Sequence, residues 1–137
     1  MTEAQAIEAI LQRWADTWPG LQAAVPYTFG NEVLEAAAIW ARVTVIPTVR
    51  EQTTMGPAGA RKFEDRGHIF VQLFGAIDVG DKPLALLAAD VRTVFEARRI
   101  GTPADINTYA GTPGRVSSDG RWAMRTVTIP FRCVETR

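Results

Sequence analysis

The fold is decided by the stretch Arg66-Gly-His-Ile-Phe-Val-Gln-Leu-Phe-Gly75, in which two kinds of side chain alternate. One face carries Ile69, Val71 and Leu73, and the other carries His68, Phe70, Gln72 and Phe74. This period of two predicts a strand from Phe63 to Gly75. After a turn, apolar residues recur at helical spacing: Leu84, Leu87, Val91 and Phe95. The sequence therefore predicts a helix from about Pro83 to Arg99, with Asp81 as its N-cap.

A further helix and two further strands are predicted outside this stretch. The helix starts with a capping-box pattern at Thr2 and Gln5, has an apolar stripe that includes both Trp14 and Trp18, and meets a stop signal at Trp18-Pro19-Gly20. β-Branched residues predict a strand over Ala38–Val49, in which Pro47 marks an end or a sheet edge. After the turn signal Ser117-Ser-Asp-Gly120, a last strand is predicted over Arg121–Val134, and Ile106–Tyr109 has the pattern of a short strand.

These elements follow the order α-β-β-α-β-β. They predict an α+β domain, in which a mainly antiparallel sheet of about four strands has two helices packed on one face. At 137 residues the chain is long enough to bury one core, so a single domain over residues 1–137 is expected.

Composition and charge limit the classes of function. The chain is 47% hydrophobic and 22% charged, as in ordinary globular proteins, and its 15 basic and 15 acidic residues cancel. Net charge therefore favours neither nucleic acid nor anionic lipid. Acidic residues predominate up to Trp40 and arginines after Ile100, an asymmetry that would let copies pack head to tail. The lone Cys133 predicts a reducing compartment. No signal peptide is evident, and no apolar run approaches the ~20 residues of a membrane span.

Two surfaces are candidates for binding. The segment Arg50–Lys62 lacks periodicity and is longer than most hairpin turns, so it is predicted to be a functional or mobile loop. The second face of each long strand is too apolar for full solvation, which fits either a minor core under loops or a subunit interface, where aromatic residues and Met are enriched. The candidate contacts on these surfaces are Arg50, Glu51, Arg61, Lys62, Phe70, Phe74, Trp122, Met124 and Arg125.

Catalytic groups are poorly supplied. A metal site needs several converging ligands, and the chain has one His and one Cys. His68 lies in the middle of a predicted strand without a nucleophile elbow, which favours a structural or interface role. Glu64-Asp65 is interpreted as a solvated strand start, and Cys133 as a buried, inert thiol. We therefore predict a protein that is not an enzyme, with no catalytic, cofactor-binding or metal-ligating residue.

Most of the chain resembles the small tail-terminator (tail-completion) proteins of siphophages and of related prophages and gene-transfer particles. The resemblance rests on the order and spacing of several segments: Arg13-Trp-Ala-Asp-Thr-Trp-Pro19, Pro26-Tyr-Thr-Phe29, Ala38-Ile-Trp-Ala-Arg-Val-Thr-Val45, Arg66-Gly-His-Ile-Phe-Val-Gln-Leu-Phe74, Leu86-Leu-Ala-Ala-Asp-Val-Arg-Thr-Val-Phe95 with Arg99-Ile-Gly101, and Asp119-Gly-Arg-Trp122 leading to Ile129-Pro-Phe131.

The resemblance implies a homo-oligomeric ring, usually a hexamer, that sits on the last ring of the tail tube. Such a ring stops tube growth and offers a joining surface to head-completion (neck) proteins. The resemblance also implies that the protein assembles in the host cytoplasm and is located in the virion tail, at the neck. DNA would contact the ring only in transit through its lumen, and no membrane partner is implied. The resemblance implies no catalytic residue.

Two other functions fit parts of the pattern. The first-helix sequence Glu8-Ala-Ile-Leu-Gln-Arg-Trp-Ala-Asp-Thr-Trp18 is also typical of small α+β barrels of the nuclear-transport-factor-2-like type, which bind or isomerise small apolar molecules in a pocket. Another neck or minor tail protein would share the same fold physics. A dimer closed around a cavity would indicate the barrel, and an open sheet in a ring would indicate the terminator.

Overall fold

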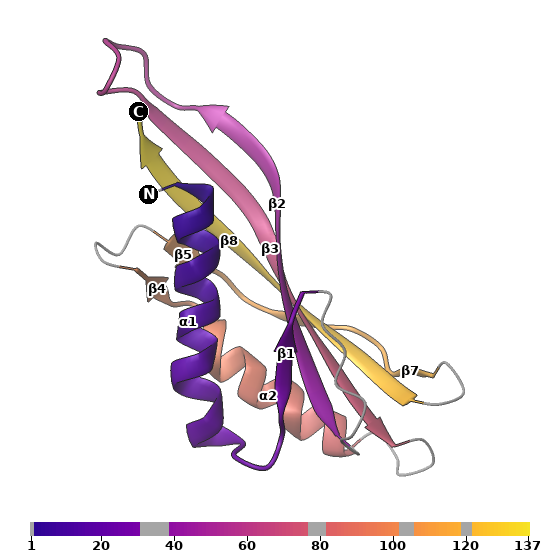
Figure 1. The fold of residues 1–137 in the computed structure, drawn as a ribbon. Helices are drawn as coiled ribbons and strands as arrows, with labels where there is room; N and C mark the ends of the chain where they lie inside the picture. The colour runs from indigo at the N-terminus through magenta and orange to yellow at the C-terminus, as the bar shows by residue number, and fades with distance from the viewer. Residues whose placement is uncertain (1, 31–38, 77–81, 102–105, 119–121) are drawn as a thin grey trace.

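The architecture is a curled sheet with two helices packed against one face (Figure 1). The computed structural model describes residues 2–30, 39–76, 82–101, 106–118 and 122–137. Four predicted features lie partly or wholly outside these residues: the Asp81 cap, residue 38 of the strand predicted over 38–49, residues 119 and 120 of the predicted turn, and residue 121 of the last predicted strand. No described helix is long and apolar enough to cross a membrane.

Helix α1 spans Glu3–Leu21 and begins where the capping box predicts. Thr2 accepts a hydrogen bond from the Gln5 amide, and the Gln5 side chain accepts one from the Thr2 amide. The predicted end is wrong, because the helix continues through Pro19 to Leu21 and ends with the Gln22 amide bonded to the Trp18 carbonyl. The buried stripe of α1 is Ala6, Ile10, Trp14 and Trp18.

Helix α2 spans Lys82–Phe95 and ends earlier than predicted. Ala97 has φ of 52°, the left-handed conformation that commonly follows a helix. The Thr108 hydroxyl donates to the Phe95 carbonyl and accepts from the Arg98 amide, so it satisfies backbone groups at this end. Arg99 belongs instead to a short strand. Ala97 is of the residue type that most favours helices, so the sequence does not indicate that α2 ends at Phe95.

Eight strands occur in the described residues, and three of them are long. The long strands are β2 (Trp40–Gln52), β3 (Lys62–Ala76) and β8 (Trp122–Thr136). The short ones are β1 (Tyr27–Phe29), β4 (Arg99–Ile100), β5 (Ile106–Thr108), β6 (Thr112–Pro113) and β7 (Ser117–Ser118). The sheet order is β1-β2-β3-β8-β5-β4, with β6 and β7 also paired to β8.

The predicted fold class is wrong. It described about four strands in a mainly antiparallel sheet in the order α-β-β-α-β-β, whereas the described chain is mostly sheet and forms a mixed, curled half-barrel. The mixture arises because β1 pairs parallel to β2, while the other pairs are antiparallel. Short strands along both sides of the three long ones widen the sheet.

The core lies between the helices and one sheet face. Ile69 pairs with Ile129 and Val71 with Val127 across β3 and β8, and all four side chains are fully buried. Trp14 stacks on Trp18 at 4.4 Å and on Phe95 at 5.8 Å between ring centroids. We call the opposite side of the sheet the open face.

Candidate functional site

The hairpin of β2 and β3 extends past the helices as an arm, which we define as residues 49–65 (Figure 1). The predicted loop Arg50–Lys62 is wrong at both ends, because β2 runs to Gln52 and β3 begins at Lys62. Pairing with β3 shifts between Pro47 and Val49, and β1 accompanies β2 only along Ala41–Val43. The strand does not end at Pro47, and among the described residues no strand pairs with β2 at Pro47 on the side away from β3, which agrees with the other predicted outcome, a sheet edge.

Hydrogen bonds within the tip of the arm involve two of the predicted site residues. Arg61 Nε donates to the Gly56 carbonyl at 2.8 Å, and the Lys62 amide donates to the Thr54 hydroxyl at 2.8 Å. Arg61 also exchanges two backbone hydrogen bonds with Arg137, which ties the arm to the end of β8. The arm is therefore an ordered projection with exposed charges at its tip.

On the helix side of the sheet, Arg50 joins all three long strands at the base of the arm. Its Nη1 contacts both carboxylate oxygens of Asp65 at 2.8 and 2.9 Å, and its Nη2 lies 2.8 Å from Glu135 Oε2. The guanidinium also lies 4.8 Å from the centre of the Phe63 ring. We call these four residues the clamp. The hydrogen bonds to Glu135 and then to Asp65 raise the pKa of Arg50.

The raised pKa fixes the sign of the pH dependence. A cation whose pKa is higher in the folded state stabilises the fold below its unfolded-state pKa, and the effect is lost only as pH rises through the folded-state pKa. For Arg50 that range is strongly alkaline. The charge of Arg50 therefore stabilises the arm throughout the physiological range.

On the open face, Glu64 is shared by two arginines. Its oxygens lie 2.5 Å from Arg66 Nε and 3.1 Å from Arg132 Nε, and the Glu64 hydrogen bond raises the pKa of Arg66. Glu64 and Asp65 are only 6% and 7% exposed, so their interpretation as a solvated strand start is wrong. Adjacent strand residues point to opposite faces, and each of these two carboxylates meets cations on its own face.

The apolar candidates of the open face separate into two places. Phe74 pairs with Met124 across β3 and β8, stacks on Trp40 at 4.1 Å, and is 8% exposed. Trp122 lies edge-on to Trp40 at 6.3 Å. Burial of Trp40 and Phe74 fits the minor core. Phe70 lies further along β3 beside His68, with 5.9 Å between ring centroids, and is half-buried.

Two candidates lie away from these clusters. Arg125 pairs with Leu73, on the face opposite to Met124, and its Nε donates to the Gly114 carbonyl at 2.9 Å. This bond holds the segment between β6 and β7 against β8. Glu51 pairs with Glu64 across β2 and β3. Whether any candidate contacts a partner stays a prediction.

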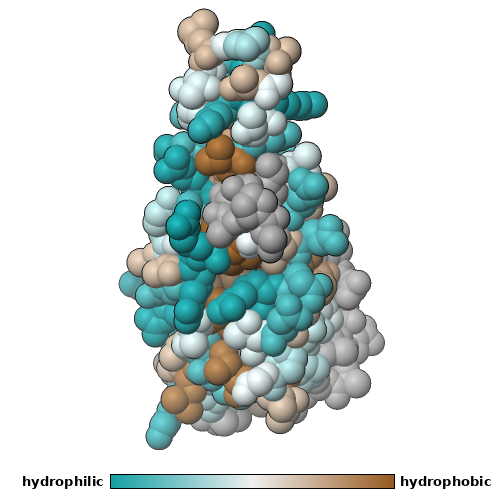
Figure 2. All heavy atoms as spheres, turned by 90° about the vertical axis from the view of Figure 1, so that its left-hand side faces the viewer, coloured by the Kyte–Doolittle hydropathy of each residue, from teal (hydrophilic) through white to brown (hydrophobic). Residues whose placement is uncertain are grey.

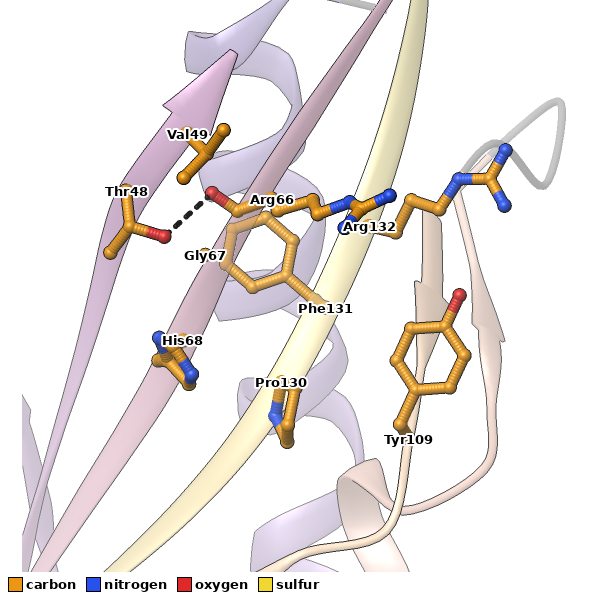
Figure 3. A pocket seen from close by; sticks show the side chains of 9 residues that line it. All are labelled: Thr48, Val49, Arg66, Gly67, His68, Tyr109, Pro130, Phe131 and Arg132. Carbon is orange, nitrogen blue, oxygen red and sulfur yellow. Dashed lines mark hydrogen bonds between the residues drawn. The ribbon is translucent and has the colours of Figure 1, made fainter. Parts of the chain in front are cut away.

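A pocket of about 400 Å³ opens beside the Glu64 cluster, at the base of the arm (Figure 3). Its lining residues come from β2, β3, β8 and the segment after β5: Thr48, Val49, Arg66, Gly67, His68, Tyr109, Pro130, Phe131 and Arg132. Gly67 is required here, since a Cβ would lie 2.5 Å from the Ile46 carbonyl oxygen and 2.8 Å from the Phe131 ring.

Sequence reasoning missed the pocket and both charged clusters. The available signal was the concentration of charged residues near the start of β3 and the end of β8: Glu64, Asp65, Arg66, Arg132 and Glu135. The prediction that Cys133 is buried is confirmed, since the thiol is 0% exposed. His68 is half-buried and lines the pocket.

Comparison with known proteins gives likenesses of fold. No family model matches the chain, and no curated protein matches its sequence. One solved structure, whose name states no function, is similar over 100% of this chain and 98% of its own, with a TM-score of 0.74 and 17% identity. A chain from the virion of a native gene transfer agent particle is similar over 99% of this chain and 100% of its own, with a TM-score of 0.55 and 12% identity. At these identities the likeness shows that the chains share a fold over their whole lengths.

Proposed function

We propose that this protein is a structural subunit of a phage-like virion and acts as a tail terminator. The observation that carries the proposal is the whole-length likeness of fold to a chain of a gene transfer agent virion. The sequence resemblance to tail-terminator proteins supports the same role independently of that comparison. The fold correction does not weaken the proposal, because the virion chain matches the structure as it is rather than the predicted four-strand sheet.

In the proposed assembly, copies form a homo-oligomeric ring, and the resemblance to tail terminators implies six copies. The ring caps the tail-tube protein, stops tube growth and presents a joining surface to the head-completion protein. DNA passes through its lumen, and the protein assembles in the host cytoplasm before it occupies the neck of the virion. The ordered arm supports this role, since a projecting hairpin tied down at both ends suits contact with a neighbouring ring.

We also propose that the protein is not an enzyme. The buried carboxylates of the described residues support this, because Glu64, Asp65 and Glu135 each form an ion pair with an arginine of another strand. Carboxylates held in this way stabilise the sheet at the base of the arm. Their arrangement explains their burial without a role in catalysis.

The test is the assembly state of the purified chain. Light scattering over rising concentration, with negative-stain images of each species, is expected to show rings with a central hole. Isolated tail tubes supply the second condition, because some rings assemble only on their template. A strict dimer without a ring would contradict the proposal, as would a monomer that fails to cap isolated tubes.

A charge reversal at the tip of the arm gives a more local prediction. Arg61→Glu is expected to leave the melting temperature within about 2 °C of the wild type, since exposed surface changes are usually worth less than about 0.5 kcal/mol. It is expected to reduce tail completion, counted as the fraction of tails of normal length. Arg99→Glu is the matched control, because Arg99 is also exposed but lies in β4, away from the arm. If the Arg61→Glu variant completes tails normally, the tip of the arm is not part of the surface that contacts a partner.

A further inference from the structure

The tip of the arm presents an uncharged, apolar surface. Residues 52–60 include no charged side chain. Met55 is 94% exposed, the largest value among the large hydrophobic residues that the structure describes. In the side view of Figure 2 the arm forms the narrow top of the molecule, and weakly hydrophobic side chains lie at its end. A side chain this exposed gains almost nothing from the fold of its own chain, so its apolar surface is left for a partner to cover.

Hydrogen bonds fix the conformation of the tip before any partner binds. Besides the bonds of Arg61 and Lys62 described above, the Ala60 amide donates to the Pro57 carbonyl at 3.1 Å, and the Thr53 amide donates to the Lys62 carbonyl at 2.8 Å. An ordered hairpin loses little conformational entropy on binding. The arm is therefore suited to place its apolar tip in a hollow of a partner.

The charges at the open-face pocket cancel. Arg66 and Arg132 line the pocket, and both bind the carboxylate of Glu64. Glu51 faces Glu64 across β2 and β3 and also acts electrostatically on Arg66. Two cations and two anions leave no net charge, and Lys62, the next cation toward the tip on this face, does not line the pocket. A further charge brought here would lose hydration without gaining a partner, so the pocket favours an uncharged occupant.

The other walls of the pocket are mainly apolar. Val49 and Tyr109 line it and are 49% and 45% exposed, with the Phe131 ring between them in the view of Figure 3. Together with Met55, they make up half of the large hydrophobic side chains that are exposed in the described chain, so exposed apolar area is concentrated at the pocket and the tip. Methionine is flexible, and its sulfur packs favourably against aromatic rings, so Met55 suits this pocket.

The length of the arm decides whose pocket Met55 can enter. Met55 lies six residues beyond Val49, which corresponds to roughly 20 Å of strand. Pairing between β2 and β3 and the backbone bonds between Arg61 and Arg137 hold the arm extended, so the tip does not fold back into the pocket of its own copy. If each tip enters the pocket of the next copy, neighbouring pockets are also roughly 20 Å apart. Six equal steps of this length can close a hexagon, so the reach of the arm is compatible with a six-membered ring.

We infer that Met55 of each copy inserts into the open-face pocket of the next copy, against Tyr109 and Phe131. The occupant is a second copy of this chain, because the tip matches the pocket in apolar character, in lack of charge and in reach. The inference rests on the proposed ring and specifies how its copies contact one another. Arg61 and Lys62 follow the turn on the other branch of the hairpin and stay available to the tail tube.

The test is a double-mutant cycle on the full chain. Met55→Lys brings a charge to a neutral pocket, and Tyr109→Glu replaces an aromatic wall with a carboxylate. Each alone is expected to weaken self-association at least about tenfold, measured by light scattering in solution and by negative-stain counts of rings on isolated tail tubes. The double variant joins lysine to glutamate at every contact and is expected to associate at least about fivefold more tightly than either single variant. Melting temperatures are expected to stay near that of the wild type, because both side chains are exposed.

Leu86→Lys is the matched control. Leu86 is an exposed hydrophobic residue like Met55, but it lies on α2, away from the arm, and its replacement is expected to leave association unchanged. Single variants that associate normally, a double variant whose loss equals the sum of the single losses, or a control that loses association equally would overturn this contact and leave the ring in place. Met55→Lys rings that form normally and fail only to cap tail tubes would overturn it too, because the tip would then contact the tube. A wild-type chain that forms no ring, in solution or on tail tubes, would overturn the proposed function as well.

Discussion

Replacing Trp14 with alanine is expected to lower the free energy of unfolding by about 3–5 kcal/mol, the range for emptying a buried aromatic position. Trp14 is 0% exposed and lies between Trp18 and Phe95, with Tyr27 edge-on at 6.0 Å. Alanine leaves a cavity between α1, α2 and the sheet. Since domains are stable by only about 5–15 kcal/mol, this loss is a large fraction of the total. Urea unfolding followed by far-ultraviolet circular dichroism measures it.

The neighbouring Trp18 provides a control, because its indole N–H donates a hydrogen bond and that of Trp14 does not. Trp18 Nε1 donates to the Val25 carbonyl at 3.1 Å, whereas Trp14 Nε1 is buried without a hydrogen-bond partner among the described residues. Trp14→Phe therefore removes an unsatisfied donor, and Trp18→Phe leaves an acceptor unsatisfied. Trp14→Phe is expected to cost less than Trp18→Phe. The reverse order, or a loss below about 1 kcal/mol for Trp14→Ala, would contradict this account of the core.

Long periodic segments could be predicted from the sequence, and short strands could not. The strand over Phe63–Gly75 and the last strand are predicted to within one or two residues of their observed ends, because alternation extends along most of each strand. β4, β6 and β7 contain two residues each, too few to show any period. These strands form only because β8 and β5 offer backbone partners, which is a property of the tertiary fold. The predicted fold class is wrong because these short strands could not be predicted.

The charged clusters escaped prediction for a related reason. Glu64-Asp65 beside Arg66 has the local pattern of a solvated strand end. Arg50, which binds Asp65, lies 15 residues before it, and Glu135 lies 85 residues from Arg50. Such partners come together only through the register of β2, β3 and β8. The sequence identified Arg50 as a contact candidate but assigned it to a loop, so its role in joining three strands could not be seen.

Replacing Arg50 with glutamate is expected to release the arm and abolish tail completion while the helices stay folded. The change sets three carboxylates against one another at a site where Asp65 and Glu135 are about nine-tenths buried. Uncompensated charge in a buried site strongly destabilises it, so the base of the arm opens. Amides of the arm are expected to exchange with solvent at least about tenfold faster, while those of α1 and α2 keep their rates. Hydrogen-exchange mass spectrometry resolves the two regions.

Two further variants separate charge from geometry at the clamp. Arg50→Lys keeps the charge but cannot form the forked contacts with Asp65 and Glu135, so arm exchange intermediate between wild type and Arg50→Glu is expected. Arg50 and Asp65 face each other directly across β2 and β3. The double variant Arg50→Glu with Asp65→Arg therefore places the guanidinium on β3, between the new glutamate and Glu135, and is expected to recover slow exchange and tail completion. An arm that stays protected in Arg50→Glu would show that backbone pairing with β8, and not the clamp, holds the arm in place.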